Sequence, residues 1–429
     1  MTRPLKTLIL AAAALGACSM DTQAQDLMSV YKHLHANPEL SLMEVETASY
    51  LAERLKTAGF DVTEKFGGTG VVAILKNGTG KTVMLRADMD GLPVKEETGL
   101  SFASEVIRKD HEGNEWPAMH ACGHDIHMTV ALGAARKLAA QKDKWSGTLV
   151  VILQPAEEIS QGALAMLGEG LFEKFPRPDY NLALHANSGL QAGMVGIVPG
   201  YALANVDSMD ITVKGIGGHG AYPQTTKDPI VLAAEMVMAF QTIVSREISP
   251  QEPAVITVGS IHGGTKHNII GEEVKMQLTL RSYSEDVRQQ TIDAIKRTAE
   301  GLAKAYGLSE DKMPVISLRN EYTPSAYNDP DLANAVMAMM KSQIGDKNVV
   351  QLDPVMGGED FGRYGKVEPK IPSLIYWLGA ASAKDVAAAK SGGKPLPSLH
   401  SPFFKPDAAV AIPVGVTTMS ETAVALFNK

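Results

Sequence analysis

Nine residues in the first third of the chain, Met119 to His127, hold three histidines, one cysteine and one aspartate. Cys122 and His124 stand two positions apart, and thiolates and imidazoles both bind zinc-like ions well. The residues that follow, 128–138, are typical of a helix, so this run is predicted to form a tight turn at a helix start, where backbone N–H groups favour a thiolate. The alternative is one buried cysteine beside histidines with ordinary structural hydrogen bonds.

Length and charge restrict the protein class. With 429 residues the chain is too long for one ordinary core, which predicts two domains. A hydrophobic content of 45% and a charged content of 21% are ordinary globular values. A net charge of −8 without a basic block argues against nucleic acid as the main partner, and we expect no internal stretch long enough to span a bilayer.

Residues 1–25 are predicted to be an export signal, because Arg3 and Lys6 precede an apolar run, 8–15, that is too short for a membrane span. The expected location is periplasmic or secreted. The run Leu15-Gly16-Ala17-Cys18 resembles a lipobox, in which the cysteine is lipidated; the alternative, slightly favoured, is cleavage after residue 17 or 24. Apart from Cys18 the chain has one cysteine, so no intrachain disulfide is expected.

Strands and helices alternate over residues 26–199, which predicts an α/β domain with a mostly parallel sheet. The expected strands are 71–75, 82–87, 148–154 and 181–184. Working groups of such sheets gather at the carboxyl ends of the strands. Four ligand-type side chains follow strand ends here: Asp88, Glu157, Glu158 and His185.

A second domain is predicted at 200–316, inserted into the first, which resumes at 317–429. Its expected order is strand, helix, two strands and helix, which is similar to a ferredoxin-like α+β sandwich. A glycine-rich loop, 215–223, follows its first strand. In the resumed domain we expect a strand at 373–378, a flexible loop at 380–397 and a closing helix at 407–427.

Mixed sulfur, nitrogen and oxygen ligands from distant loops are too many for one tetrahedral structural zinc and suit two ions with a bridging ligand. The candidates are Cys122, His124, Glu157 or Glu158, His185 and His400. A carboxylate that is not a ligand must then carry the proton. Of the neighbouring glutamates, Glu157 and Glu158, one can bind metal while the other carries the proton. A solvated loop is the alternative for such a glutamate pair.

Three motifs together identify the chain as similar to the M20 metallopeptidases, in the amidohydrolase branch of hippurate hydrolases, N-acyl-amino-acid amidohydrolases and auxin-conjugate hydrolases. They are the run 119–125, Pro155-Ala156-Glu157-Glu158 and the Gly217-Gly218-His219 loop. The resemblance extends from His35-Ala36-Asn37-Pro38-Glu39-Leu40 to Leu399-His400-Ser401-Pro402. It implies a zinc-peptidase-like catalytic domain, an inserted lid and dimerisation domain, and two divalent ions per subunit, zinc before manganese, cobalt or nickel.

The resemblance also implies roles for single residues. Cys122 would be a bridging ligand and Glu157 the general base, with Asp88 orienting a ligand histidine from outside the coordination sphere. The remaining ligands would be His124, Glu158, His185 and His400. Arg86 stands where other branches carry a metal-binding histidine.

In the inserted domain the resemblance implies that His219 reaches across a homodimer or higher homo-oligomer to polarise the scissile carbonyl. Asn268 and Arg281 match positions that grip the substrate carboxylate. The alternatives are polar turn residues for His219 and Asn268, and an ion pair with a nearby acid for Arg281. Gly220 stands where the family usually has alanine, on the side of the site that would hold the substrate carboxylate.

The expected function is metal-dependent hydrolysis of the amide of an N-acyl or N-aroyl amino acid, which releases a carboxylic acid and a free amino acid. The substrate would be hippurate-like, with bulky aroyl-phenylalanines of the ochratoxin type as one form. A dipeptidase or aminoacylase is the alternative within the same class. A non-catalytic metal or amino-acid binding protein is the alternative outside it, although such a protein would not need a base.

Overall fold

The computed structural model describes residues 25–319 and 322–429, so the expected export signal and Cys18 lie outside the described residues. The chain divides into two compact units. The catalytic unit comprises the chain up to Gly200 together with Asn328–Asp353 and Tyr364–Lys429, and the inserted unit comprises Tyr201–Tyr327 and Pro354–Arg363. The domain boundaries expected from the sequence remain a prediction.

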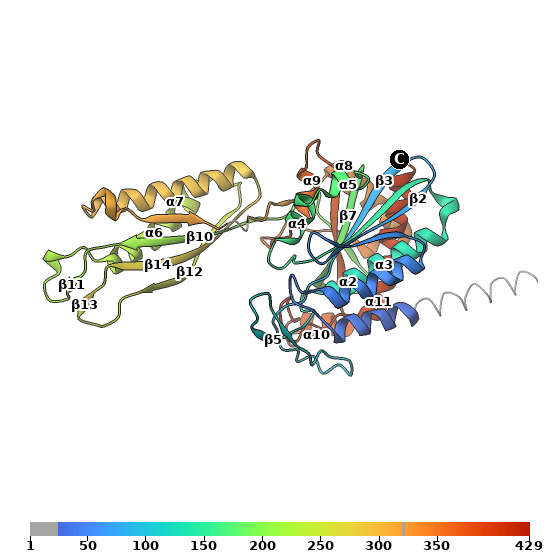
Figure 1. The fold of residues 1–429 in the computed structure, drawn as a ribbon, viewed down its shortest axis with the longest axis horizontal. Coiled ribbons are helices and arrows are strands. Elements are labelled where there is room, and N and C mark those ends of the chain that lie inside the picture. The colour runs from blue at the N-terminus through green and yellow to red at the C-terminus, as the bar shows by residue number, and fades with distance from the viewer. Residues whose placement is uncertain (1–24, 320–321) are drawn as a thin grey trace, which may run out of the picture. The chain divides into compact units, whose positions relative to one another are not determined.

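The catalytic unit is built on an eight-stranded mixed sheet with the order β1-β2-β6-β3-β7-β18-β8-β17 (Figure 1). Its strands are β1 (Asp61–Phe66), β2 (Gly70–Asn77), β3 (Lys81–Asp88), β6 (Gly147–Gln154), β7 (Tyr180–Gln191), β8 (Val195–Ile197), β17 (Val349–Gln351) and β18 (Ser373–Ala381). The four central strands are parallel, and β1, β2 and β6 pair antiparallel. The central strands are almost continuously buried, as expected for strands covered on both faces.

Helices cover this sheet. They are a helix at 25–36, α2 (Val45–Thr57), α3 (His124–Ala140), α4 (Gly162–Gly168), α5 (Leu171–Lys174), α8 (Pro330–Ile344), α9 (Gly362–Lys366), α10 (Ala383–Lys390) and α11 (Ala408–Phe427). Helix α3 packs on β3 and β7 and against α11, and its residues are buried on nearly every side. The core therefore holds the start of α3, where the predicted ligands Cys122 and His124 lie, against the centre of the sheet.

By length and composition alone, two described helices are long and apolar enough to cross a bilayer, which the sequence prediction did not expect. Helix α11 is one of them, and 56% of its most apolar window is buried in the structure. It packs against α3, α8 and the sheet, as a core helix does. The other is α6 (Pro229–Arg246) of the inserted unit.

The inserted unit has a four-stranded antiparallel sheet with the order β12-β14-β10-β15 and two long helices. Its elements are β9 (Gly200–Leu203), β10 (Asn205–Lys214), β11 (Gly218–His219), α6, β12 (Ala254–Gly263), β13 (Ile269–Ile270), β14 (Glu273–Ser282), α7 (Glu285–Ala305), β15 (Val315–Leu318) and β16 (Ala326–Asn328). Burial alternates strictly along β10, so one face of the sheet packs on its own core with α6 and α7. The order is that of a ferredoxin-like sandwich.

Three local expectations differ from the structure. Residues 380–397 were expected to be a loop, but β18 continues to Ala381 and α10 follows, because Ser382 caps it by accepting from the Asp385 N–H. His185 was expected at a strand end, but β7 continues to Gln191, while its pairing with β3 ends at Ala183. The hairpin of β4 (Ile107–Lys109) and β5 (Glu115–Pro117) was not anticipated.

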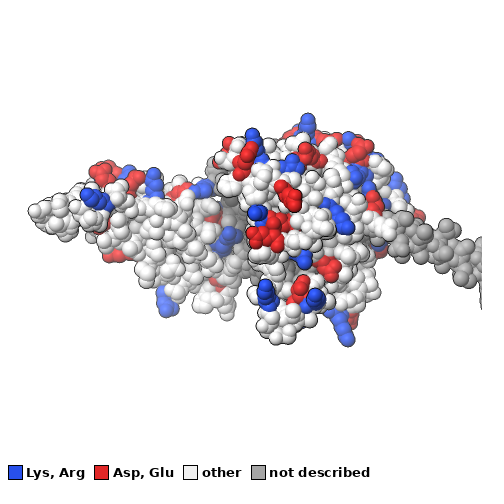
Figure 2. Space-filling view, turned by 90° about the horizontal axis from the view of Figure 1, so that it is seen from below, with Lys and Arg blue, Asp and Glu red and all other residues white. Residues whose placement is uncertain are grey.

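Charged side chains are mixed on the surface. On the face drawn in Figure 2, Lys and Arg are scattered among Asp and Glu over the catalytic unit. Several of these charges form exposed ion pairs, such as Lys56 with Glu64 and Lys81 with Asp179. Exposed pairs of this kind add little stability.

Candidate metal centre

The turn before α3 is shaped by Gly123. This residue has a left-handed backbone with φ +86°, and a Cβ there would lie 2.9 Å from the Cβ of Ala186 and 3.4 Å from the Phe404 ring. Only glycine meets both conditions without strain. The turn places Cys122 and His124 on either side of this glycine, both buried beside β7.

The five predicted ligands converge. Cys122 Sγ lies 3.5 Å from His185 Nε2 and 3.3 Å from His400 Nε2. Glu158 completes the group, with one carboxylate oxygen 3.5 Å from His400 Nε2 and the other 3.9 Å from His124 Nε2. Two clusters result, Cys122 with His124 and His185, and Cys122 with Glu158 and His400, each with ligand atoms within 4.8 Å of one another. Cys122 belongs to both, as the predicted bridging ligand must.

Hydrogen bonds orient two of the imidazoles. His124 Nδ1 is 2.8 Å from the carbonyl oxygen of Asp90, and His185 Nδ1 is 2.8 Å from the carbonyl oxygen of Ala186. A carbonyl only accepts, so each Nδ1 carries a proton and each Nε2 faces the cluster, where the neutral ring offers a lone pair to an ion. This is the tautomer that a metal ligand of this geometry requires.

The charge balance of the cluster fits divalent ions. His124 Nε2 and Glu158 Oε1 are buried and have no hydrogen-bond partner among the described residues. Burial raises the pKa of the Cys122 thiol, and Glu158 and Glu157 raise it further. Burial lowers the pKa of His124, but nearby carboxylates, Asp88 foremost, outweigh it and raise this pKa to about 10. A cation would offset this surplus of negative charge and hold Cys122 as a thiolate, and the mixed donor set suits a zinc-like ion.

Asp88 bonds to a histidine that we did not predict to have a role. Its Oδ1 accepts from His127 Nδ1 at 2.6 Å, whereas the ligand atom Nε2 of His124 lies 3.7 Å from the other oxygen, too far for a hydrogen bond. His127 Nε2 accepts the Ala186 N–H at 2.7 Å, so His127 is neutral, and burial lowers its pKa to about 3. Asp88 also pairs with buried Arg86. Asp88 therefore orients His127, and His127 in turn holds the backbone N–H of Ala186, the residue after His185.

A buried ion triad supports the other side of the turn. His35 donates from Nδ1 to Asp125 Oδ2 at 2.7 Å and from Nε2 to Glu96 Oε1 at 3.1 Å, and all three side chains are at most 1% exposed. Because both ring nitrogens face carboxylates, the imidazole carries both protons and a positive charge. Asp125 follows His124 directly, so this triad ties the 25–36 helix to the start of α3.

We predict that this triad makes stability depend on pH. Burial lowers the pKa of His35, but the hydrogen bonds and charges of Asp125 and Glu96 outweigh it and raise this pKa from 6.5 to about 9. The folded state then keeps a proton that the unfolded state has lost. The stabilisation is complete below pH 6.5 and is lost as the pH rises through about 9, and it is worth on the order of 3 kcal/mol. Urea unfolding of metal-replete protein should show this slope, and His35→Gln should remove it; equal slopes would contradict the assignment.

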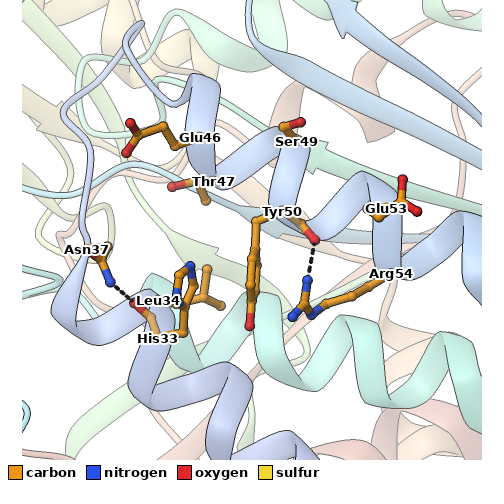
Figure 3. Close-up of a pocket in the computed structure, with 9 residues that line it drawn as sticks. All are labelled: His33, Leu34, Asn37, Glu46, Thr47, Ser49, Tyr50, Glu53 and Arg54. Atoms are coloured by element: carbon orange, nitrogen blue, oxygen red, sulfur yellow. Dashed lines mark hydrogen bonds between the residues drawn. The ribbon is translucent and has the colours of Figure 1, made fainter.

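A separate surface pocket lies between the 25–36 helix and α2, with a volume of about 450 Å³ (Figure 3). The Tyr50 ring is stacked between His33, with ring centroids 4.0 Å apart, and the Arg54 guanidinium, 3.4 Å from the ring centroid. None of the predicted ligands lines this pocket. It has no part in the site described above.

In the inserted unit, His219 lies on β11 and Asn268 directly precedes β13, which pairs with β11. Gly220 N donates to the Asn268 carbonyl at 2.9 Å, and a Cβ at Gly220 would lie 3.1 Å from the Asn268 carbonyl carbon. The glycine thus allows the two strands to approach closely. His219 Nδ1 accepts from the Ala221 N–H at 3.0 Å, so the proton is on Nε2 and the exposed ring presents an N–H donor.

Arg281 lies on β14, next to the last residue of the strand, and is half-buried. It donates from Nη1 to the Met356 carbonyl at 3.2 Å and from Nε to Thr279 at 3.3 Å. Among the described residues it forms no ion pair, which disfavours the alternative of a pair with a nearby acid. Burial lowers the pKa of Arg281, as expected for a cation without a nearby acid.

Four residues for which we predicted no role contact the site or its turns: His35, Glu44, Asp90 and His127. Strand β3 ends at Asp88, and Asp90 follows two positions later. This second acid after a strand end could have indicated that Asp90 belongs to the site. His35 belongs to the run quoted for the family resemblance. His127 is one helical turn after His124 or Gly123 on α3, a position that faces the same side.

A family model described as peptidase family M20/M25/M40 matches residues 84–392. An N-acetyldiaminopimelate deacetylase of Streptococcus sanguinis is 35% identical over 395 residues, which cover 91% of this chain and 96% of the relative. Thermostable carboxypeptidase 2 of Saccharolobus solfataricus is 36% identical over 83% of this chain and 86% of its own length.

Solved structures show the same likeness. A putative aminohydrolase from methicillin-resistant Staphylococcus aureus superposes with a TM-score of 0.80 at 32% identity, over 94% of this chain and 97% of that one. A dinuclear metal-binding peptidase of the M20 family from Bacillus subtilis superposes with a TM-score of 0.77 at 29% identity, over 95% and 99% of the two chains. These likenesses agree with the fold class expected from the sequence, an α/β unit with an inserted α+β unit.

Proposed function

Because this chain belongs to peptidase family M20/M25/M40 and is a hydrolase of amide bonds, we propose that it cleaves N-acyl amino acids. The cleaved bond joins an acyl or aroyl group to the nitrogen of an amino acid with a free carboxylate. The observation that carries the proposal is the convergence of Cys122, His124, Glu158, His185 and His400 in two clusters that share Cys122, beside Glu157. The proposed site takes two divalent ions, zinc before manganese, cobalt or nickel.

Each residue has a defined task in the proposed reaction. When bound, the ions would supply an acidic water and stabilise negative charge on the carbonyl oxygen. Glu157 accepts the proton of the attacking water and returns it to the leaving nitrogen as the carbon–nitrogen bond breaks. Asp90 and Ala186 hold the rings of His124 and His185 through their carbonyl oxygens. The products are a carboxylic acid and a free amino acid.

The finer choice of substrate starts from the relatives, one group of which is named for N-acetyldiaminopimelate and another for carboxypeptidase activity. We propose an N-acylated amino acid whose carboxylate is bound by Arg281 and Asn268, since the Arg281 guanidinium has no acid of its own among the described residues and suits a two-pronged carboxylate contact. Hippurate-like and bulky aroyl-phenylalanine amides of the ochratoxin type belong to this class.

The test is a panel of amides on metal-reconstituted protein. We expect the highest kcat/KM on one of N-acetyl-diaminopimelate, hippurate, N-acetyl amino acids or an aroyl-phenylalanine. Amidated substrates, which lack the carboxylate, should lose about 10-fold to 100-fold. A preference for unblocked dipeptides would support a dipeptidase instead. Loss of all hydrolysis in protein that holds two ions would support a non-catalytic binding protein.

We also propose that the inserted unit forms a homodimer, in which His219 Nε2–H donates to the developing oxyanion of the neighbouring subunit. Strand β12 is an edge of its sheet, and exposed apolar side chains lie on it and on α6, with Ile261 48%, Val231 49% and Met238 71% exposed. An unpaired edge beside apolar side chains suits a second copy of the same surface. Sedimentation of the wild type and of Met238→Glu tests this; a monomeric wild type would remove the proposal.

Export is a further part of the proposal. The basic start and short apolar run of residues 1–25 support it. Mass spectrometry of the mature protein distinguishes a lipid on Cys18 from cleavage after residue 17 or 24. An intact N-terminus on protein recovered from the cytoplasm would contradict export.

A further inference from the structure

The buried acid Glu44 has partners that its place in the chain does not explain. It directly precedes α2, where a carboxylate would normally cap the helix, and yet it makes no capping hydrogen bond. Glu39 performs that task, since its carboxylate accepts the N–H groups of Thr47 at 2.7 Å and Glu46 at 3.2 Å. The Glu44 side chain is 0% exposed and does not bond to the N–H groups at the start of α2.

The Glu44 carboxylate holds the backbone of the segment that carries the predicted base. Its Oε1 accepts the Ala156 N–H at 2.8 Å, and its Oε2 accepts from Thr69 Oγ1 at 2.6 Å. Ala156 has φ +49°, a left-handed conformation that is unfavourable for a residue with a side chain. Ala156 directly precedes Glu157, so its conformation sets the direction in which the chain presents the glutamate pair.

A second buried carboxylate holds the other side of the same turn. Asp90 Oδ2 accepts the Glu158 N–H at 3.0 Å and the Ser41 hydroxyl at 2.7 Å. Glu157 thus lies between two residues whose backbone N–H groups are each bound by a buried carboxylate from a distant segment. Among the described residues Glu44 has no ion pair with a cation, and burying an acid in this way is costly unless it holds something.

We propose that Glu44 is a positioning residue for the reaction: its carboxylate fixes the left-handed turn at Ala156 and thereby aims Glu157 and Glu158. This inference rests on the proposed function of the two glutamates. The positioning role requires the length of the Glu44 side chain rather than its charge, because Glu44 supplies an acceptor for the Ala156 N–H at a set distance.

Three conservative variants separate reach from charge. Glu44→Asp keeps the charge but withdraws the acceptor by one methylene, and we expect kcat to fall about 10-fold to 100-fold with KM changed less than about twofold. Glu44→Gln keeps the reach, because its amide oxygen can accept from Ala156 while its NH₂ group donates to Thr69, and should keep kcat within about threefold of wild type. Glu39→Asp is the matched control, since it shortens a buried carboxylate that holds two N–H groups of α2, and should change kcat less than about twofold.

Each outcome decides the matter. A Glu44→Asp enzyme with wild-type kcat, an equal loss in Glu44→Gln, or an equal loss in Glu39→Asp would overturn the proposal. If the wild type hydrolyses no amide, the proposed function fails, and Zn²⁺ affinity measured by chelator competition decides alone. Glu44→Asp should then bind Zn²⁺ about tenfold more weakly than wild type and Glu39→Asp equally well; equal affinities in all three proteins would overturn the positioning role.

Discussion

Replacing Glu157 with Gln is expected to lower kcat by about 100-fold to 10,000-fold, because an amide cannot accept the proton of the attacking water. The change keeps the size of the side chain. Glu157 is buried beside His124, with its Oε2 3.9 Å from His124 Nε2, and it is assigned no ligand role. Bound metal should therefore stay at the wild-type level, as measured by elemental analysis alongside steady-state kinetics.

The neighbouring glutamate provides the matched comparison. Glu158→Gln removes a predicted ligand with the same substitution one position away, so it should lower metal affinity first and regain part of its activity at high metal concentration. Wild-type turnover in metal-loaded Glu157→Gln protein would remove Glu157 as the base. Loss of metal from both variants alike would show that the two tasks are not divided between the glutamates.

Replacing Cys122 with Ser is the second change with a large expected effect. The sulfur lies 3.3 Å from His400 Nε2 and 3.5 Å from His185 Nε2 and belongs to both ligand clusters. A serine hydroxyl is a poorer ligand because it stays protonated, so both ions should bind more weakly and activity should fall by at least about 100-fold. Metal content and the rise of Tm on adding Zn²⁺ are the measurements.

A second variant separates the ligand role from packing. Cys122 is 6% exposed and lies near the small apolar cluster of Ala121, Ala186 and Phe404. Ala121→Ser adds the same hydroxyl to that cluster without touching a ligand atom, and it should lower Tm but leave metal binding intact. If Cys122→Ser binds two ions as tightly as wild type, the shared-ligand assignment is wrong.

Much of the site could be predicted because ligand chemistry is carried by residue type. Cys122, His124, Glu158, His185 and His400 were all selected from the sequence, and the structure brings them together. The α/β fold class was predictable for a similar reason, since the apolar runs of β3, β6 and β18 are as continuous as two-sided burial requires.

The hydrogen-bond partners of the buried carboxylates could not be predicted from the sequence. Glu39 and Glu44 are chemically alike and five positions apart, and one caps a helix while the other holds the turn before the predicted base. Likewise, Asp88 bonds His127 rather than a predicted ligand. Such pairings arise from tertiary packing over 8 to 112 residues of sequence separation, which local patterns do not record.

The spread of the ligands along the chain has a consequence for how the ions are acquired. Cys122 and His400 are 278 residues apart and meet only after β18 is in place in the sheet. A growing polypeptide therefore lacks the complete set until His400 has left the ribosome and its segment has folded against Cys122. We therefore expect the complete site to take up its ions only after this stage, from those present wherever folding ends.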